Sequence, residues 1–373
     1  MSPATHPVAG RALVVAGVLL LTVLVTAPRV PYEWDAASTW IARAEQERET
    51  AGVLLAAMRT PGDWPLLMPE IGAHVFPVGH VMIVGALARA LPAGVSAKRA
   101  ADAWLGVLLL LLLWSLHGVV APEARLVDML PSLLIFACPF TVVHLRSGYA
   151  DLFVGVLAAT ASVCAIRAVE APTIGRWLAW VAVASVLCQT KTDGVILLMA
   201  SSAAALAMAA RRRLWSWRVA ALHTLVPLVN VGGWWLLMRQ LYGPAFPPLT
   251  RAVSGFELAQ GSRFLYEAAR HLLDVDTWGW TWGLLLGVAV ARRNVLWACQ
   301  VGVAIGLYTA AHVIGAAQMT HVLSLGIIMN RLLLQVLVGS IPFAWPLAHS
   351  AGGQNLDYHE HPPGTLFPVG RTD

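Results

Sequence analysis

Charge is the scarcest feature of this 373-residue chain: only 12% of its residues are Asp, Glu, Lys or Arg, whereas 58% are hydrophobic. Soluble domains carry about 25% charged residues, so the composition excludes an ordinary soluble enzyme. Long runs without charge recur along the chain, for example at 13–27 and 104–121. A helix of about 20 apolar residues spans the hydrocarbon core of a bilayer. The sequence therefore predicts an all-α polytopic membrane protein.

Cysteine is also scarce, and no internal repeat or heptad pattern is visible. The four cysteines lie in apolar runs without paired spacing, which favours small core residues over disulfides or a metal site. The net charge of +5 comes from short basic clusters such as 211–213 and 292–293. Such clusters are typical of the cytoplasmic ends of membrane helices, so nucleic acid is not an expected partner.

Apolar segments long enough to form or contribute to spans predict about ten or eleven transmembrane helices within residues 1–348. They fall near 11–27, 75–91, 102–121, 128–145, 149–168, 176–190, 192–210, 218–240, 278–291, 294–316 and 326–347. The first could be a cleaved signal peptide, but its length favours an uncleaved span. The polar, Gly- and Pro-rich stretch 349–373 is expected to be a disordered cytoplasmic tail.

Loop charge gives an expected topology. Segment 28–74 has three more acidic than basic residues and segment 243–277 has one more, which indicates two external loops. The basic pairs Lys98–Arg99 and Arg292–Arg293, and the cluster 211–213, are expected in the cytoplasm.

Five apolar segments separate Lys98–Arg99 from the cluster 211–213, yet a shared side requires an even number of crossings. Pro131 and Pro139 interrupt a straight helix. We therefore expect 102–145 to cross only once, which places Asp151, Lys191 and Asp193 outside.

Residues 36–50 in the first external loop are expected to form a helix lying in the membrane interface. Ala37, Trp40, Ile41 and Ala44 recur at the spacing of one helix face. The acids at 45, 47 and 49 are expected to point elsewhere. Prolines at 61, 65 and 69 then predict a rigid, non-helical return.

Five short motifs, in order along residues 30–340, resemble bacterial polytopic glycosyltransferases of the GT-C superfamily, related to protein mannosyltransferases and aminoarabinose transferases (glycosyltransferase family 39-like). The motifs are "EWDAASTWIARA" (33–44), "GDWPLLMPEIGA" (62–73), "SGYADL" (147–152), "TKTDG" (190–194) and "MNRLLLQVL" (329–337). Thr192 and Asp193 depart from the usual Asn and Glu. The resemblance implies a multi-pass protein of the plasma (inner) membrane with an extracytoplasmic active site.

The resemblance also implies the chemistry. A sugar would move from a polyprenyl-phosphate donor to a hydroxyl of a lipid, glycan or protein acceptor, with inversion and with Asp35 as general base. Asp151 would be a second acid that orients the acceptor or holds a cation. The alternative for each is a helix N-cap.

Cations near the outer face are candidate contacts for the donor phosphate. We expect Lys191 and Arg331 to bind it, since a guanidinium fork suits phosphate oxygens and an ionisable residue within a span defaults to a functional hypothesis. An interfacial lysine and a snorkelling arginine are the alternatives. The other substrate-binding candidates are Arg146, Asp193, Trp34, Trp64 and Tyr149.

A divalent cation is an open question, because some relatives of this kind use one and others do not. Glu70 and His74 are one helical turn apart and are weak candidate ligands; a packed or interfacial histidine is the commoner case. Two other functions remain as alternatives: a transporter or lipid carrier, and a non-catalytic membrane subunit. Many transporters contain paired repeats, and none is visible here.

Overall fold

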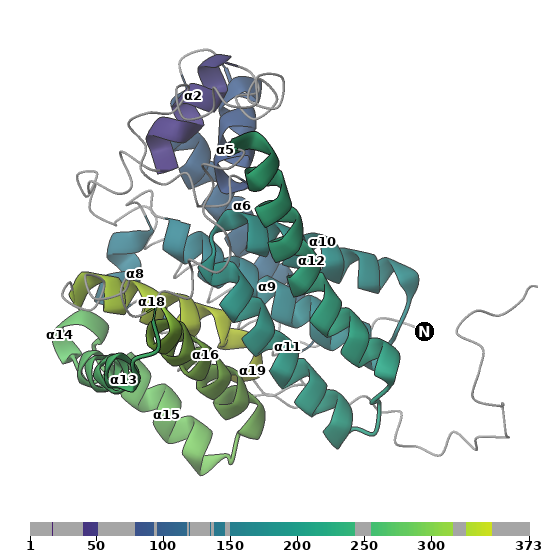
Figure 1. The fold of residues 1–373 in the computed structure, drawn as a ribbon, viewed down its shortest axis with the longest axis vertical. Helices are drawn as coiled ribbons and strands as arrows, with labels where there is room; N and C mark the ends of the chain where they lie inside the picture. Colours follow the sequence, from purple (N-terminus) through teal and green to yellow (C-terminus); the bar gives the residue numbers. More distant parts are fainter. Residues whose placement is uncertain are drawn as a thin grey trace, which may run out of the picture.

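The computed structural model describes residues 17, 40–50, 79–92, 95–117, 119, 135, 138–145, 150–242, 255–315 and 326–344. These ranges form 14 helices, so the expected all-α fold is confirmed (Figure 1). The helices are α2 (Ala42–Thr50), α5 (Gly79–Ala90), α6 (Ala97–His117), α8 (Pro139–His144), α9 (Ala150–Glu170), α10 (Ile174–Thr190), α11 (Asp193–Arg211), α12 (Trp217–Tyr242), α13 (Leu258–Leu272), α14 (Val275–Trp278), α15 (Thr281–Ala291), α16 (Val295–Ile314), α18 (Gly326–Gly339) and α19 (Ile341–Ala344).

Five of these helices are long and apolar enough to cross a membrane: α6, α9, α11, α12 and α16. Shorter apolar helices of 10–17 residues come from α5, α10, α15 and the second part of α18. The chain is therefore a multi-pass membrane protein. The expected first span, 11–27, lies outside the described residues apart from Gly17.

Helix α9 is the centre of the bundle, because 89% of its most apolar window is buried inside the protein. Its sequence is rich in Ala, Gly, Ser and Thr, the small residues that let membrane helices approach closely. A β-carbon added to Gly155 would lie 2.9 Å from Val338 Cβ, and one added to Gly339 would lie 3.2 Å from Ala158 Cβ. The small residues of α9 thus bring α18 into direct contact, with both helices running in the same direction.

The helices around α9 do not all run in the same direction. Helix α11 runs parallel to α9, since Ser162 Oγ donates to Ser201 Oγ at 2.9 Å and the starts of both helices also meet. Helix α16 runs back, because Gln300 reaches Ser201 near the middle of the bundle whereas Tyr308 reaches Gln335 beside the start of α9. The starts of α9 and α11 therefore meet the second half of α18 at one end of the bundle.

The direction of α6 corrects the expected topology. Arg167 Nη2, near the end of α9, donates to the carbonyl oxygen of Ser115, near the end of α6, at 2.9 Å. At its other end, the backbone N–H of Ala97 donates to Glu45 of α2. Helix α2 packs on α5, whose His80 ring lies 4.4 Å from the ring of Phe153 at the start of α9. Helix α6 therefore runs parallel to α9.

It follows that Lys98–Arg99 and the cluster 211–213 lie at opposite ends of the bundle, and the expectation of a shared side was wrong. The expectation that 102–145 crosses once was wrong for the same reason. Helix α6 ends beside Arg167, whereas α8 packs on α9 with His144 close to Asp151. Segment 102–145 therefore begins and ends at the same end of the bundle. Pro139 begins α8, where a proline at the first helical position lacks no required hydrogen bond.

The expected 36–50 helix is observed from residue 40 onward, with α2 beginning at Ala42, and Trp40 and Ala44 of its expected apolar face are buried inside the protein. Glu47 was expected to point elsewhere than this apolar face, but it is buried too. Its carboxylate accepts a hydrogen bond from Arg89 Nη1 of α5 at 3.1 Å, and this ion pair holds α2 against α5. Figure 1 shows α2 at the extremity of the molecule.

Helix α13 occupies much of the 243–277 segment, for which the sequence analysis predicted only an external loop. Its buried face packs across the end of α16: the Phe264 ring lies 4.4 Å from that of His312, and a β-carbon on Gly261 would lie 2.5 Å from Val313. Leu258, Leu265 and Tyr266 remain exposed. The helix therefore covers the end of the bundle at which α9 and α11 begin.

Single-cysteine labelling tests the corrected topology in a background whose four native cysteines are replaced by alanine. Cysteines at the exposed positions 99 and 257 are expected to react from one side of a sealed vesicle, and cysteines at 211 and 292 only from the other. The reason is that position 99 lies at the start of α6, whereas α11 and α15 end at the opposite end of the bundle. Reaction of position 99 together with 211 and 292 would overturn the direction of α6.

Candidate functional site

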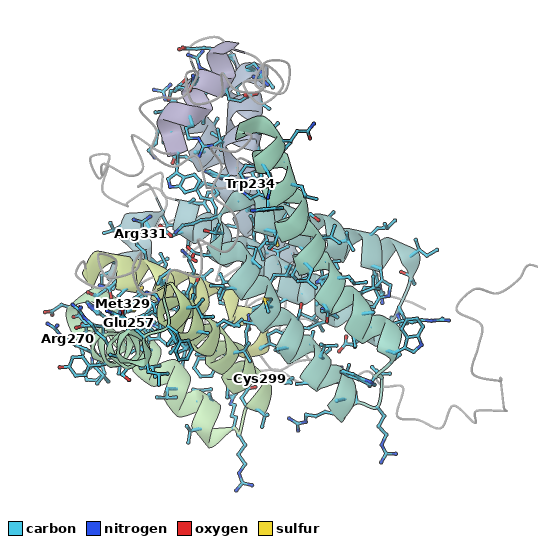
Figure 2. All side chains as sticks on the ribbon, viewed as in Figure 1. Trp234, Glu257, Arg270, Cys299, Met329 and Arg331 are labelled. Carbon is cyan, nitrogen blue, oxygen red and sulfur yellow. The ribbon has the colours of Figure 1, made fainter. Side chains whose placement is uncertain are left out.

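The most concentrated group of buried charges among the described residues consists of two carboxylates and two cations, joined by one amide. The members of this group, hereafter the ion cluster, are Asp151, Lys191, Asp193, Arg331 and Gln335. Asp151 lies in the first turn of α9, Lys191 follows the end of α10 as its C-cap, Asp193 begins α11, and the last two lie on α18. The four ionic members were all predicted as site residues, and the structure brings them together. Figure 2 shows Arg331 on α18, at a higher level than Cys299 near the start of α16.

Asp151 is the hub of the ion cluster. Lys191 Nζ donates to Asp151 Oδ1 at 2.8 Å, and Arg331 Nε donates to Asp151 Oδ2 at 2.6 Å. Gln335 Nε2 also donates to Asp151 Oδ1, at 2.5 Å. A carboxylate that accepts from three donors, two of them charged, is a poor proton acceptor because protonation would break those bonds.

Asp193 forms the second, more open part of the ion cluster. Its Oδ2 lies 2.6 Å from Lys191 Nζ and accepts from Gln335 Nε2 at 3.2 Å. Its side chain is 17% exposed, whereas that of Asp151 is fully buried. Asp193 is therefore the carboxylate of the ion cluster nearer to solvent.

Two glycines make this arrangement possible. A β-carbon on Gly155 would lie 3.4 Å from the Cα of Gln335, so a larger residue would push α18 away from Asp151. A β-carbon on Gly194 would lie 2.2 Å from the carbonyl oxygen of Leu187. Gly194 thus permits the tight turn between α10 and α11 that sets Lys191 and Asp193 side by side.

The charges of the ion cluster compensate one another, with two cations against two carboxylates. Burial alone would lower the pKa of Lys191, but the adjacent carboxylates of Asp151 and Asp193 outweigh burial and hold that pKa above its ordinary value. Lys191 therefore stays protonated at neutral pH. It can donate hydrogen bonds to an anion, but it cannot act as a general base.

Gln335 and Tyr308 are members of this site that the sequence reasoning missed. Gln335 bridges the two carboxylates and accepts from the Tyr308 hydroxyl on α16 at 3.1 Å. A signal for Gln335 was present: it lies four residues after Arg331 and so on the same helix face. Tyr308, in an apolar run on another helix, carried no such signal.

The geometry argues against the purely structural alternatives for three predicted residues. Asp151 lies inside α9 and its carboxylate bonds other helices, so it is not an N-cap. Arg331 is 7% exposed and turns toward Asp151 rather than snorkelling to an interface. Lys191 is 9% exposed and paired twice, unlike an ordinary interfacial lysine.

The other predicted site residues lie outside the described part of the chain. They are Asp35, Trp34, Trp64, Arg146 and Tyr149, together with the candidate metal ligands Glu70 and His74. Within the described ranges, no group of three or more His, Cys, Asp or Glu side chains is placed to hold a metal ion.

Comparison with known proteins finds no family model, no curated protein and no solved structure that matches this chain. The chain is an all-helical protein with five candidate membrane spans, and the site must be interpreted from its own residues.

Proposed function

We propose that this protein is an integral membrane glycosyltransferase that moves a sugar from a polyprenyl-phosphate donor to an acceptor hydroxyl. The observation that carries the proposal is the convergence of three separate motifs, 147–152, 190–194 and 329–337, on one ion cluster. Asp151 and Lys191 are 40 residues apart, and Asp151 and Arg331 are 180 apart, yet both pairs are in hydrogen-bond contact. Buried ionisable groups in a membrane protein are costly and mark functional sites.

The proposed roles follow from the hydrogen bonds. Departure of the polyprenyl phosphate leaves negative charge on its oxygens, which cationic donors stabilise. Lys191 and Arg331 would supply those donors, and Asp151 would fix their positions rather than take a proton. The general base is then Asp35, which would accept the proton of the acceptor hydroxyl as that oxygen attacks the anomeric carbon.

An extracytoplasmic site is favoured by the charges at the two ends of the bundle. Among the described residues, the end of α9, the start of α10 and the segments where α11 and α15 end contain several arginines, at 167, 176, 211–213 and 292–293, and a single acid, Glu170. Such an excess is typical of the cytoplasmic side, so the ion cluster would face outward. Lys98 and Arg99 at the outer end depart from the rule, although the Lys98 ammonium lies 2.6 Å from Asp102.

Transfer itself is the test that separates the candidate functions. Purified protein in nanodiscs is expected to convert a radiolabelled polyprenyl-phosphate sugar and a hydroxyl acceptor into glycosylated product. The alternative of a lipid carrier predicts movement of the labelled donor between leaflets of sealed liposomes with no product. Carriage without transfer, over a panel of lipid, glycan and peptide acceptors, would reject the glycosyltransferase proposal.

Arg331→Gln is expected to weaken binding of the donor by roughly ten- to a hundred-fold, because a charge-assisted contact in a buried site contributes about 1.5–3 kcal/mol. Donor titration of purified protein measures the effect. Arg263→Gln on the exposed face of α13 removes the same charge at the same end of the bundle and should leave binding unchanged. A folded Arg331→Gln protein with wild-type donor affinity would contradict the assignment.

A further inference from the structure

A second polar site lies at the opposite end of the bundle from the ion cluster, between the end of α9 and the start of α10. It is a cavity of about 440 Å³, within the 300–1,000 Å³ range of ligand pockets. Arg167 and Glu170 line it from α9, and Gly175 and Arg176 line it from α10. A β-carbon on Gly175 would meet no atom within 4 Å, so this wall of the cavity is open.

Positive charge in and beside this cavity exceeds negative charge. The carboxylate of Glu170 is already paired with Arg212 Nη1. Arg167 and Arg176 have no carboxylate within ion-pair distance among the described residues. They bond carbonyl oxygens instead: Arg176 Nη1 donates to Ala171 at 2.9 Å and to Arg167 at 3.4 Å, and Arg167 Nη2 donates to Ser115. The cavity and its immediate surroundings therefore contain three guanidinium groups and one carboxylate.

These hydrogen bonds fix the two guanidinium groups without neutralising them. A guanidinium carries five N–H donors, and the bonds to carbonyl oxygens use one nitrogen of each side chain. The remaining donors of Arg176 are accessible, since its side chain is exposed. A fixed pair of cations lining one cavity is suited to an anion with several oxygens, such as a phosphate group.

The surroundings of the cavity indicate where that phosphate comes from. Trp114 of α6 is 70% exposed, and its ring lies 6.0 Å from the Arg167 guanidinium. Exposed tryptophans of membrane proteins lie at the headgroup level. Ile174 and Leu178 of α10 and Leu110 of α6 are also exposed and apolar, as required of surfaces that contact acyl chains. Basic pockets between membrane helices at the cytoplasmic side bind anionic lipid headgroups.

We propose that this cavity binds the phosphate group of an anionic phospholipid, with Arg167 and Arg176 as its ligands and the apolar faces of α6 and α10 against its acyl chains. The site is separate from the ion cluster and does not depend on the proposed transferase activity. A bound lipid would join α6, α9 and α10 at the end of the bundle where Arg167 already connects α6 to α9.

Native mass spectrometry of the full chain tests the proposal with phosphatidylglycerol and phosphatidylcholine as probes. The wild-type protein should retain phosphatidylglycerol in preference to phosphatidylcholine. Arg176→Gln, an exposed side chain whose loss leaves the core intact, should reduce that retention roughly tenfold, the effect of one lost charge-assisted bond. Arg293→Gln, at the same end but outside the cavity, should retain phosphatidylglycerol like the wild type.

Inorganic phosphate distinguishes a lipid from a free anion. If the cavity takes a lipid, millimolar phosphate should leave retention of phosphatidylglycerol nearly unchanged. Displacement of phosphatidylglycerol by phosphate would assign the site to the free anion and overturn the lipid assignment. Equal retention of the two lipids, or equal retention by the Arg176→Gln and wild-type proteins, would overturn the site itself.

Discussion

Asp151→Ala is expected to lower the free energy of unfolding by about 3–5 kcal/mol, the usual effect of removing one partner from a buried ion pair. Asp151 is fully buried and accepts from Lys191, Arg331 and Gln335. Without it, Arg331 loses the carboxylate at 2.6 Å and Lys191 keeps only Asp193. Two cationic side chains of the ion cluster would then face a single carboxylate, that of Asp193.

Unfolding of the purified protein in detergent, followed by tryptophan fluorescence, measures this effect. Asp102→Ala is the matched control, because Asp102 also accepts from a lysine at 2.6 Å but its side chain is 37% exposed. Exposed ion pairs contribute about 0–1 kcal/mol, so the control should unfold nearly like the wild type. Equal stability of the Asp151→Ala and Asp102→Ala proteins would show that the ion cluster does not hold the helices together.

The double variant Asp151→Leu/Arg331→Met separates stability from function. It removes one cation and one anion together and leaves Lys191 paired with Asp193. Replacing a buried ion pair by apolar side chains is often neutral or stabilising, so this variant should be more stable than Asp151→Ala. It should nevertheless lose sugar transfer, because the proposed phosphate contact of Arg331 is gone. Undiminished transfer would make the ion cluster purely structural.

Helix positions could be predicted from the sequence because the apolar runs and their breaks are local features. The run 149–168 became α9 (Ala150–Glu170), and 192–210 became α11 (Asp193–Arg211). Helix α13 was missed because its charged residues Arg263, Glu267 and Arg270 dominated the reading of 243–277 as a loop. Its buried residues Gly261, Phe264 and Ala268 do follow a helical spacing.

The direction of α6 could not be predicted because it depends on contacts between distant segments. The charge of Lys98–Arg99 indicated a cytoplasmic end, but Asp102 lies one turn away and offsets that charge. What places α6 is the contact of Ala97 with Glu45 at one end and that of Ser115 with Arg167 at the other. Neither contact has any signature in the local sequence.

The members of the ion cluster could be predicted from the sequence, but their pairing could not, because it also depends on contacts between distant segments. The motif resemblance, together with the apolar surroundings of Arg331, identified Asp151, Lys191, Asp193 and Arg331 one at a time. Their pairing was not visible, since it depends on how closely α18 approaches α9 through Gly155. The pairing changes the interpretation of Asp151: a carboxylate expected to orient the acceptor or hold a cation is engaged with two cationic side chains and an amide.

With Asp151 engaged in this way, our proposed general base is Asp35, which lies outside the described residues. Asp35→Asn should lower the rate of sugar transfer by about 10²–10⁴-fold, the usual effect of removing general-base catalysis. The substitution preserves the size of the side chain and its ability to cap a helix, because Asn is as good an N-cap as Asp. Expression, membrane insertion and donor binding should therefore stay close to wild type.

The measurement is transfer of a labelled sugar from a polyprenyl-phosphate donor by purified protein in nanodiscs. Asp35→Glu should keep a small part of the activity, since the carboxylate remains but is displaced by one methylene. Glu49→Gln is the control, because Glu49 is an exposed acid of α2, in the same predicted external loop, whose carboxylate lies 3.2 Å from Arg48. It should transfer sugar like the wild type. Near-normal transfer by Asp35→Asn would remove the base from Asp35 and assign it to Asp193, the carboxylate of the ion cluster nearer to solvent.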